Sequence, residues 1–541
     1  MKKLILIAFL AVLSSCKTLT KTKEAFNWDG ANLYFLMTDR FKNGDKSNDV
    51  NFNRTEKAAV LRGFEGGDLR GIIQKIDDNY FSNLGINAIW ITPIVEQIHG
   101  YTDEGTGKTY AFHGYWTKDW SALDPNFGTK KELKELVEKA HKKGIRIVLD
   151  AVINHTGPVT PEDPVYPNDW VRTSPTCTYD NFKNTTECTL VANLPDIKTE
   201  DNSPVELPKM LTDKWKKEGR YESEMESLNV FFRKYNFPKA AKYYIMKWLS
   251  DYILEFGIDG YRIDTAKHVN EDVWKDFYKV CQDDFKAYKK NNPSKVLDNA
   301  PFFTVGEVYG YGISQKQLYN FGDKKVNYFQ NGFHSLINFD FKSDVNKSYE
   351  ELFSKYDQLL HSDLKGKSVL NYLTSHDDGS PFDKNRTRTF EAGTKLLLSP
   401  GVSQIYYGDE SARPLEIKGA EGDANLRSDM NWDDEKTNPS TKNLLLHYQK
   451  LGKFRANHPS IGAGKHEMLS KSPYWFSRIL NDDKVIVGLD LNLGVKKVNV
   501  SKVFSNGMIL RDAYSGKNAK VIDGEIVVDS PFNIVLLEKI K

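Results

Sequence analysis

Three carboxylates each follow an apolar run at well-separated points along the chain. Asp264 ends Gly-Ile-Asp-Gly-Tyr-Arg-Ile-Asp, Glu307 ends Phe-Phe-Thr-Val-Gly-Glu, and Asp377 ends Tyr-Leu-Thr-Ser-His-Asp. A carboxylate at the C-terminal end of a barrel strand commonly takes part in chemistry. Cleavage of a glycosidic bond uses two carboxyl groups with different pKa values. These residues make glycoside cleavage the first hypothesis to test.

The neighbours of each carboxylate suggest different roles. Arg262 lies two residues before Asp264, so both side chains face the same way on a strand, and the guanidinium favours the ionised carboxylate. Glu307 has no cation within four residues, which predicts a drier carboxyl with a raised pKa, suited to a general acid. His376 and Asp377 together suit binding of sugar hydroxyls and stabilisation of a cationic transition state. Each acid alone could equally be a surface or capping residue.

The elements that must position these residues have the pattern of a barrel. Eight apolar, β-branched runs alternate with helical periodicity, which predicts an α/β fold, a (β/α)8 TIM barrel. The helix 130–143 is typical, with an apolar face that ends at Gly144. The predicted strands are 33–38, 88–92, 145–150, 260–264, 302–306, 335–339, 369–374 and 403–407.

Two segments depart from the barrel pattern. Roughly a hundred residues separate the third strand from the fourth, far more than a usual loop, which predicts an inserted subdomain. After about residue 456, short alternating runs and turn pairs such as Asn506-Gly507 predict an antiparallel β-sandwich domain. The predicted units are a signal peptide (1–15), a tether (16–26), the barrel (27–155 and 239–455), the inserted subdomain (156–238) and the C-terminal domain (456–541).

The N-terminus has the features of an export signal. Met1-Lys2-Lys3 precedes an apolar run, 4–13, that is too short to span a bilayer. Leu-Ser-Ser-Cys at 13–16 resembles a bacterial lipobox, in which Cys16 would carry the lipid; ordinary cleavage beside an incidental cysteine is the alternative. We expect an exported protein anchored in the bacterial outer membrane, at the periplasmic face or the cell surface.

The composition of the chain limits the classes of partner that it can bind. Lys and Arg number 75 and Asp and Glu 73, so no net field selects nucleic acid or an acidic polymer. Cys177 and Cys188 flank a short polar loop in an exported chain, which predicts a disulfide. Cys281 lies in a predicted helix and reads as a buried thiol. No Cys/His spacing resembles a zinc site.

Six ordered sequence blocks carry a resemblance to the α-amylase family, glycoside hydrolase family thirteen, over roughly residues 30–540. The blocks begin at Asp150, Leu194, Gly260, Gly306, Ser375 and Gly401. The resemblance implies Asp264 as nucleophile, Glu307 as acid/base and Asp377 as transition-state stabiliser in a retaining reaction. Such a reaction requires the first two carboxyls to be about 5–5.5 Å apart. The implied sugar-binding residues are Tyr115, Trp116, His155, Arg262, Lys267, His268 and His376.

The resemblance also implies calcium, a hard cation that takes oxygen ligands from side chains and carbonyls. One site would use Asn154, Asp196 and the backbone carbonyl of His268. A second candidate resembles the calcium loop of cyclodextrin glucanotransferases, although a polar turn without metal would look similar. Its implied residues are Asn43, Asp45, Asn48, Asp49, Gly66 and Asp68.

Within the family, Leu194-Pro-Asp-Ile197 and Lys267-His268 resemble α-amylases. The expected function is therefore endo-type hydrolysis of α-1,4 bonds in starch, glycogen or maltooligosaccharides, by a monomer. Two alternatives remain: a glucan transferase that uses the same intermediate, and a non-catalytic glycan-binding lipoprotein, since fold alone does not give function. Ser375 stands where many relatives have Asn, which leaves the positioning of Asp377 open.

Overall fold

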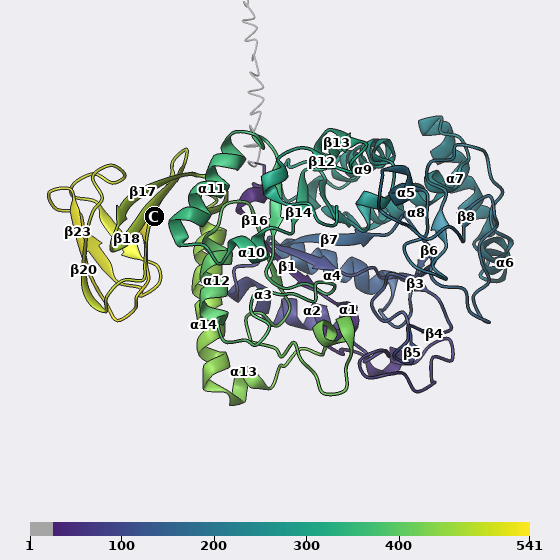
Figure 1. Cartoon of the computed structure of the whole chain (residues 1–541), viewed down its shortest axis with the longest axis horizontal. Coiled ribbons are helices and arrows are strands. Elements are labelled where there is room, and N and C mark those ends of the chain that lie inside the picture. Colours follow the sequence, from purple (N-terminus) through teal and green to yellow (C-terminus); the bar gives the residue numbers. More distant parts are fainter. Residues whose placement is uncertain (1–24, 541) are drawn as a thin grey trace, which may run out of the picture.

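The computed structural model describes residues 25–540, and its centre is a closed barrel of eight parallel strands (Figure 1). Each strand pairs with its two neighbours, and the first closes onto the last, with Asn32 opposite Ser403. All eight predicted strands are present, with ends shifted by up to three residues. They are β1 (Asn32–Leu36), β2 (Ala88–Ile91), β7 (Arg146–Ala151), β10 (Gly260–Ile263), β11 (Phe303–Gly306), β14 (Ser335–Asn338), β15 (Ser368–Asn371) and β16 (Val402–Tyr406).

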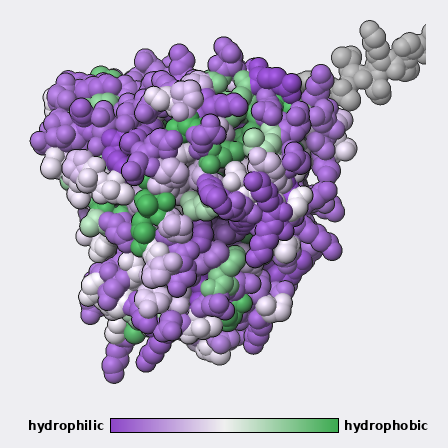
Figure 2. All heavy atoms as spheres, turned by 90° about the vertical axis from the view of Figure 1, so that its right-hand side faces the viewer, coloured by the Kyte–Doolittle hydropathy of each residue, from purple (hydrophilic) through white to green (hydrophobic). Residues whose placement is uncertain are grey.

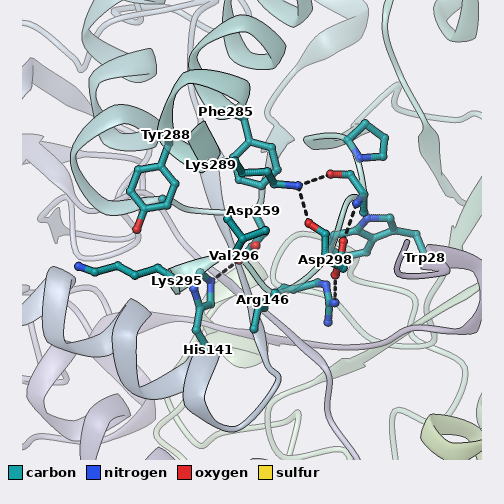
Figure 3. A pocket seen from close by; sticks show the side chains of 14 residues that line it. Trp28, His141, Arg146, Asp259, Phe285, Tyr288, Lys289, Lys295, Val296 and Asp298 are labelled. Atoms are coloured by element: carbon teal, nitrogen blue, oxygen red, sulfur yellow. Dashed lines mark hydrogen bonds and ion pairs between the residues drawn. The ribbon is translucent and has the colours of Figure 1, made fainter. Parts of the chain in front are cut away.

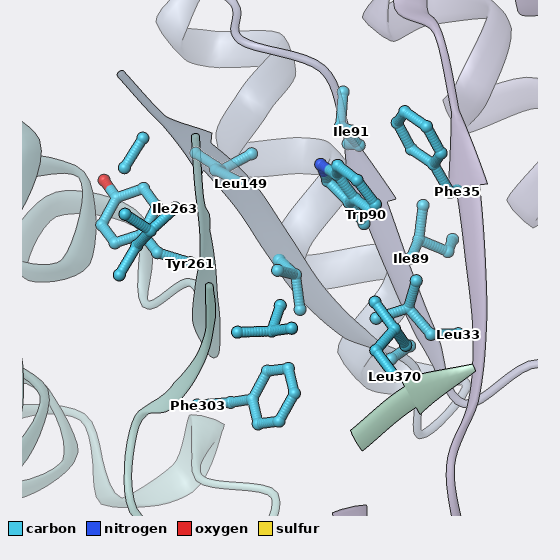
Figure 4. Close-up of a cluster of buried hydrophobic side chains, with 14 of the residues drawn as sticks. Leu33, Phe35, Ile89, Trp90, Ile91, Leu149, Tyr261, Ile263, Phe303 and Leu370 are labelled. Atoms are coloured by element: carbon cyan, nitrogen blue, oxygen red, sulfur yellow. The ribbon is translucent and has the colours of Figure 1, made fainter. Parts of the chain in front are cut away.

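The barrel strands are buried on both faces, which explains why their sequences are continuous apolar runs. Inside the barrel, Phe35 stacks on Trp90 with ring centroids 3.6 Å apart. Leu149 and Leu370 lie in the same buried cluster, which Figure 4 shows from within. The interior is therefore a packed core, and a ligand can reach the barrel only at its ends.

Helices cover the outside of the barrel. In α4, Thr129 and Glu132 form a reciprocal capping box, and the predicted apolar face is buried. The expectation of a helix after every strand fails once: β11 and β14 are joined by the hairpin β12–β13 and two 3-10 turns, Ile313–Gln315 and Tyr328–Asn331. The covering helices are α2 (Leu69–Asp77), α4 (Lys130–Lys142), α8 (Ala241–Phe256), α9 (Glu271–Asn291), α11 (Tyr349–His361), α12 (Thr389–Leu398) and α14 (Pro439–Asn457).

Between β7 and β10 the chain leaves the barrel, as predicted. A disulfide joins Cys177 and Cys188 in this segment, while Cys281 is a buried free thiol on α9. Three helices here were not predicted; one of them, α6, buries Leu211 and Trp215 within an otherwise Lys-rich stretch. The elements are β8 (Val171–Arg172), α5 (Lys183–Thr186), β9 (Asp196–Ile197), α6 (Lys209–Lys217) and α7 (Tyr221–Tyr235).

Shorter elements fill the other connections. The β2–α4 connection holds four strands, of which β3 and β6 pair with each other. The remaining short elements are β3 (Val95–Gln97), β4 (Thr102–Asp103), β5 (Lys108–Thr109), β6 (Thr117–Leu123), β12 (Tyr319–Asn320), β13 (Lys325–Val326), α1 (Thr38–Phe41), α3 (Tyr80–Asn83), α10 (Phe341–Asp344), α13 (Asp434–Thr437) and α15 (Ser460–Ala463).

The C-terminal part is antiparallel, as predicted. A six-stranded sheet, ordered β17-β18-β19-β24-β21-β22, faces the pair β20-β23, and Ile486 and Ile526 belong to the core between them. Four of these strands, β17, β18, β21 and β22, were not predicted. The bounds are β17 (Lys465–Lys471), β18 (Tyr474–Leu480), β19 (Asp483–Leu489), β20 (Gly494–Asn499), β21 (Ile509–Asp512), β22 (Asn518–Lys520), β23 (Glu525–Ser530) and β24 (Val535–Lys539).

The surface carries little contiguous apolar area on the face that Figure 2 shows, where hydrophobic atoms form small separate groups among hydrophilic ones. Within residues 25–540, no helix has the length and apolar character needed to cross a membrane. The predicted signal peptide and Cys16 lie outside the described residues.

Candidate active site

The three carboxylates meet at the C-terminal ends of the barrel strands. Asp264 directly follows β10 and Glu307 directly follows β11. These strands are neighbours, with Ile263 opposite Gly306, so the two carboxylates emerge side by side. Asp377 follows β15 and accepts a hydrogen bond from Arg427, across the barrel mouth. The positions predicted from sequence therefore converge on one end of the barrel.

Arg262 organises this cluster from the barrel interior. Its Nη1 lies 2.7 Å from Asp264 Oδ1, and its Nη2 lies 2.8 Å from Glu307 Oε2. The same Nη1 also lies 3.1 Å from Asp150 Oδ1. Glu307 has no cation within four residues in sequence, but the strand register brings Arg262 to it.

Burial raises the pKa of the acids that share Arg262. Desolvation raises the pKa of Glu307 to about 7, against the opposing effect of Arg262. Burial likewise raises the pKa of Asp150 to about 7. The pKa of Asp264 is also raised by burial, with Arg262 opposing, so the sequence-based expectation of a simply favoured carboxylate is corrected. One guanidinium cannot neutralise three buried acids.

Asp377 is held differently. The Asp377 side chain is 44% exposed, and His376 and Arg427 together outweigh its partial desolvation and hold its pKa far below the usual range. His376 Nε2 lies 2.8 Å from Asp377 Oδ2. Ser375 Oγ accepts from the backbone N–H groups of Asp377 at 3.4 Å and Asp378 at 3.3 Å, so the serine fixes this turn itself. Asp377 is the acid of the cluster that stays ionised.

A left-handed backbone residue lies between the two predicted catalytic carboxylates. Thr265 has φ +46°, an unusual conformation for a β-branched residue. Its backbone N–H donates to Glu307 Oε2 at 3.0 Å. Strained backbone of this kind persists where the surrounding structure holds it, and it gathers at functional sites. Here the strain orients Glu307.

An aromatic wall borders the carboxylates. The Tyr115 ring stacks on His376 with centroids 5.1 Å apart, and its hydroxyl donates to Asp150 Oδ2 at 2.8 Å. The imidazole Nε2 of His155 lies 3.1 Å from the backbone oxygen of Tyr115, which supports the ring from behind. A small pocket beside Glu307 is lined by further rings, including Tyr309.

The other predicted sugar-binding residues lie farther out. Trp116 packs in a small cluster with Ile98 and Leu194, so its indole is part of a local core. Lys267 is more exposed and its Nζ donates to the backbone oxygen of Tyr309 at 3.4 Å. His268 is buried, with Nδ1 3.0 Å from the Thr185 carbonyl of the inserted segment.

The first set of predicted calcium ligands comes together. One terminal atom of the Asn154 amide lies 3.3 Å from Asp196 Oδ1 and 3.1 Å from the His268 carbonyl oxygen. If that atom is nitrogen, the amide donates to both; if it is oxygen, three oxygens converge as a hard cation requires. The donor set therefore fits calcium, at the join between β7 and the inserted segment.

The second set also forms a compact cradle. Asn43 Oδ1 and Asn48 Oδ1 are buried without a hydrogen-bond partner. Gly66 has φ +89°, and a Cβ there would lie 2.4 Å from Asn43 Nδ2 and 2.6 Å from Asp49 Oδ1. Asp68 accepts from the backbone N–H of Asp45 at 2.8 Å. Orphaned oxygens in a space that only glycine leaves open fit a cation as well. No group of three or more His, Cys, Asp or Glu side chains within residues 25–540 is arranged to hold a metal, so both cradles need Asn or backbone oxygens beside their carboxylates.

Two residues of the cluster were given no role in the sequence analysis. Asp150 ends a predicted strand on the same face as its neighbours, a signal that could have found it. Arg427 lies in a 3-10 helix 50 residues beyond Asp377, and its Nε donates to the His376 carbonyl at 3.0 Å. No local pattern marks it, because only the fold brings that loop to the barrel mouth.

Known proteins share this arrangement. Residues 35–455 match the family model described as alpha amylase, catalytic domain. The periplasmic α-amylase of Escherichia coli (strain K12) is 36% identical over 534 residues, covering 86% of this chain and 73% of that protein. A cyclomaltodextrin glucanotransferase from Niallia circulans is 27% identical, and the match covers 89% of this chain and 62% of the transferase.

Solved structures agree with the sequence matches. An Anoxybacillus α-amylase superposes with a TM-score of 0.64 at 26% identity, covering 95% of this chain and 99% of that one. A Geobacillus thermoleovorans α-amylase, at 23% identity and a TM-score of 0.65, shares the fold over 95% of this chain and 99% of its own. With the barrel and the matched catalytic domain on one chain, the protein is an enzyme of the α-amylase family, glycoside hydrolase family thirteen.

Proposed function

We propose that this chain hydrolyses internal α-1,4 bonds of starch, glycogen and maltooligosaccharides with retention of configuration. The observation that carries the proposal is the single guanidinium of Arg262, which lies 2.7 Å from Asp264 and 2.8 Å from Glu307. One guanidinium that contacts both carboxyl groups places them close together, as a nucleophile and an acid/base on one sugar unit require.

In the first step, an oxygen of Asp264 bonds to the anomeric carbon while Glu307 gives its proton to the departing glycosidic oxygen. The raised pKa of Glu307, about 7, supports a protonated acid before the reaction. Asp377, ionised beside His376 and Arg427, stabilises the positive charge that develops on the sugar. In the second step, Glu307 takes a proton from water, and the water oxygen replaces Asp264 at the anomeric carbon.

The residues around the carboxylates would bind the sugar. Tyr115, stacked on His376, offers its edge and face to the sugar ring, and His155 holds Tyr115 in place. Lys267 and His268 lie toward the inserted segment and would contact the leaving part of the chain. We infer that Trp116 stabilises the aromatic wall next to Tyr115 and does not contact the sugar, because its indole is packed in a local core.

Calcium would occupy the Asn154, Asp196 and His268 carbonyl site, and the cradle of Asn43, Asn48, Asp49 and Asp68 would hold a second ion. Calcium supplies oxygen coordination that ties loops together, and it has no role as an acid or base here. At the first site it would fix the inserted segment against the end of β7. At the second it would relieve the orphaned oxygens of Asn43 and Asn48.

The chain's place in the cell and its division into units are proposed from the sequence pattern. Export with a lipid on Cys16 is supported by the N-terminal pattern, and the name of the Escherichia coli relative, periplasmic α-amylase, supports export. Division at about residues 156, 239 and 456 is supported by where the chain leaves and rejoins the barrel.

A second candidate, transfer of the glycosyl group to another sugar, is favoured by one observation: a cyclomaltodextrin glucanotransferase is 27% identical over 89% of this chain. Incubation of the purified chain with soluble starch and with maltoheptaose, in calcium and in EGTA, separates the candidates. Shorter maltooligosaccharides alone support hydrolysis. Cyclic products, or products longer than maltoheptaose, support transfer, and no turnover of either substrate rejects both.

A further inference from the structure

A groove of about 1000 Å³ lies between the barrel and the C-terminal domain, outside the carboxylate cluster. One wall comes from α12 and α14, which run along the side of the barrel next to the C-terminal domain (Figure 1). The other wall comes from Tyr514 and the segment 532–534. The groove is large enough for a ligand of several rings.

Aromatic side chains stand in this groove. Phe390 on α12 is 48% exposed. Tyr514 and Phe532 meet edge to face with centroids 5.1 Å apart, and Lys450 lies 4.2 Å from the centre of the Phe532 ring. Phe390 is exposed on one wall and Phe532 is half-buried on the other. Rings open to a groove are typical of a binding site, where a ligand covers them.

The polar side chains of the groove form hydrogen bonds across it, and its acidic and basic residues are equal in number. His447 holds the two walls together, with Nδ1 2.8 Å from the Tyr514 hydroxyl and Nε2 3.0 Å from the Phe390 carbonyl. Asn443 is an exposed amide at the rim that can donate and accept. The acids Glu391 and Asp490 match the bases Lys395 and Lys450 in number. This balance suits a neutral, hydroxyl-rich ligand and gives no preference for a phosphate.

We propose that this groove is a second binding site for α-glucan, which holds part of the polymer while another part occupies the barrel mouth. The proposal rests on the proposed function for the identity of the polymer. Sugar rings present C–H faces that stack on aromatic rings and hydroxyls that pair with amides, which is the mixture this groove offers. Two linked contacts on one polymer bind more tightly than either alone, so the groove would act on long chains and leave short ones unaffected.

Retardation in native gels that contain glycogen tests the proposal. We expect Phe390→Ala to weaken retardation by about fivefold, the loss typical of truncating an aromatic anchor. Asn443→Ala is a second variant that removes an exposed amide without touching the core, and it should weaken retardation by a smaller factor. Val527→Ala, an exposed apolar residue of the C-terminal domain outside the groove, serves as the matched control.

Hydrolysis assays separate this inference from the proposed function. Turnover of maltotetraose should stay at the wild-type level in Phe390→Ala and Asn443→Ala, while kcat/KM on glycogen falls. If both variants are retarded like wild type, the groove does not bind glucan, although the hydrolase remains. If retardation is unchanged and sedimentation shows that the variants disrupt self-association, the groove is a contact between copies and the inference is wrong. If the wild type turns over no α-glucan, the proposed function fails, and retardation still reports on the groove.

Discussion

The buried acids are paired one-to-one with bases at the N-terminal end of the barrel, whereas at the C-terminal end several acids share one base. At the N-terminal end, Arg146 contacts Asp298, Lys289 Nζ donates to the Asp298 and Ala300 carbonyls at 3.0 and 2.6 Å, and His141 lies 2.8 Å from Asp259 (Figure 3). Arg146 outweighs burial and lowers the pKa of Asp298. Each acid here has its own base, so the charges are neutralised in place.

At the C-terminal mouth, Asp150, Asp264 and Glu307 share Arg262 alone. Burial then raises the pKa of Glu307 to about 7. The same residue types are thus structural at one end and poised to exchange protons at the other. The ratio of acids to bases, rather than burial itself, decides which end can do chemistry.

The largest expected effect is a loss of activity when an acid at the C-terminal end of the barrel is replaced. Glu307→Gln keeps the shape of the side chain but cannot transfer a proton, so we expect kcat on maltoheptaose to fall by about 10³-fold or more, with the unfolding temperature within a few degrees of wild type. Release of reducing ends measures kcat. Glu138→Gln, on the exposed side of α4, is the matched control and should keep full activity. A Glu307→Gln enzyme with more than a tenth of wild-type kcat would contradict the assignment.

At the N-terminal end of the barrel, a substitution should reduce stability and leave activity unchanged. Arg146→Met leaves Asp298 buried without its partner, so we expect a loss of about 3 kcal/mol in the free energy of unfolding with kcat/KM unchanged. Urea denaturation measures the loss. Lys130→Met removes an exposed pair with Glu255 and should cost no more than about 0.5 kcal/mol. A loss of activity in Arg146→Met without a loss of stability would remove the distinction between the two ends.

Removing calcium should lower the stability of the protein. Ion present at about 100 times its dissociation constant adds about 2.7 kcal/mol of stability, so EGTA should lower the unfolding temperature by several degrees. Asn154→Ala should reduce this calcium-dependent shift, while Asn168→Ala, in an exposed part of the inserted segment, should not. Differential scanning calorimetry measures both. Equal curves with calcium and EGTA would argue against both proposed ions.

The last expected effect is a dependence of the rate on pH. Glu307 must be protonated to act as the acid, and its raised pKa means that the proton is held up to about pH 7 and lost above it. We therefore expect kcat/KM to fall about tenfold per pH unit on the alkaline side. Initial rates on maltoheptaose from pH 5 to 9 test this, with thermal unfolding followed at each pH. A rate that stays flat to pH 9 would place the pKa of the acid elsewhere.

Local sequence was enough where one strand or its immediate neighbour decides the geometry. Apolar runs predicted all eight barrel strands, because strands buried on both faces leave a continuous signal. The spacing of two residues between Arg262 and Asp264 predicted their contact, which the structure has at 2.7 Å. Helices α6 and α7 were missed because their polar faces hide a short apolar stripe.

By itself the sequence determined which acids, aromatics and strands this protein has, and their order, since these follow from residue type and short-range period. Only the tertiary structure decided how those groups are charged. It brought Arg262 to Glu307, which has no cation among its sequence neighbours, and it brought Arg427 to Asp377 from 50 residues away. The physical reason is that a pKa depends on distance and burial in space, and neither quantity is carried by neighbours along the chain.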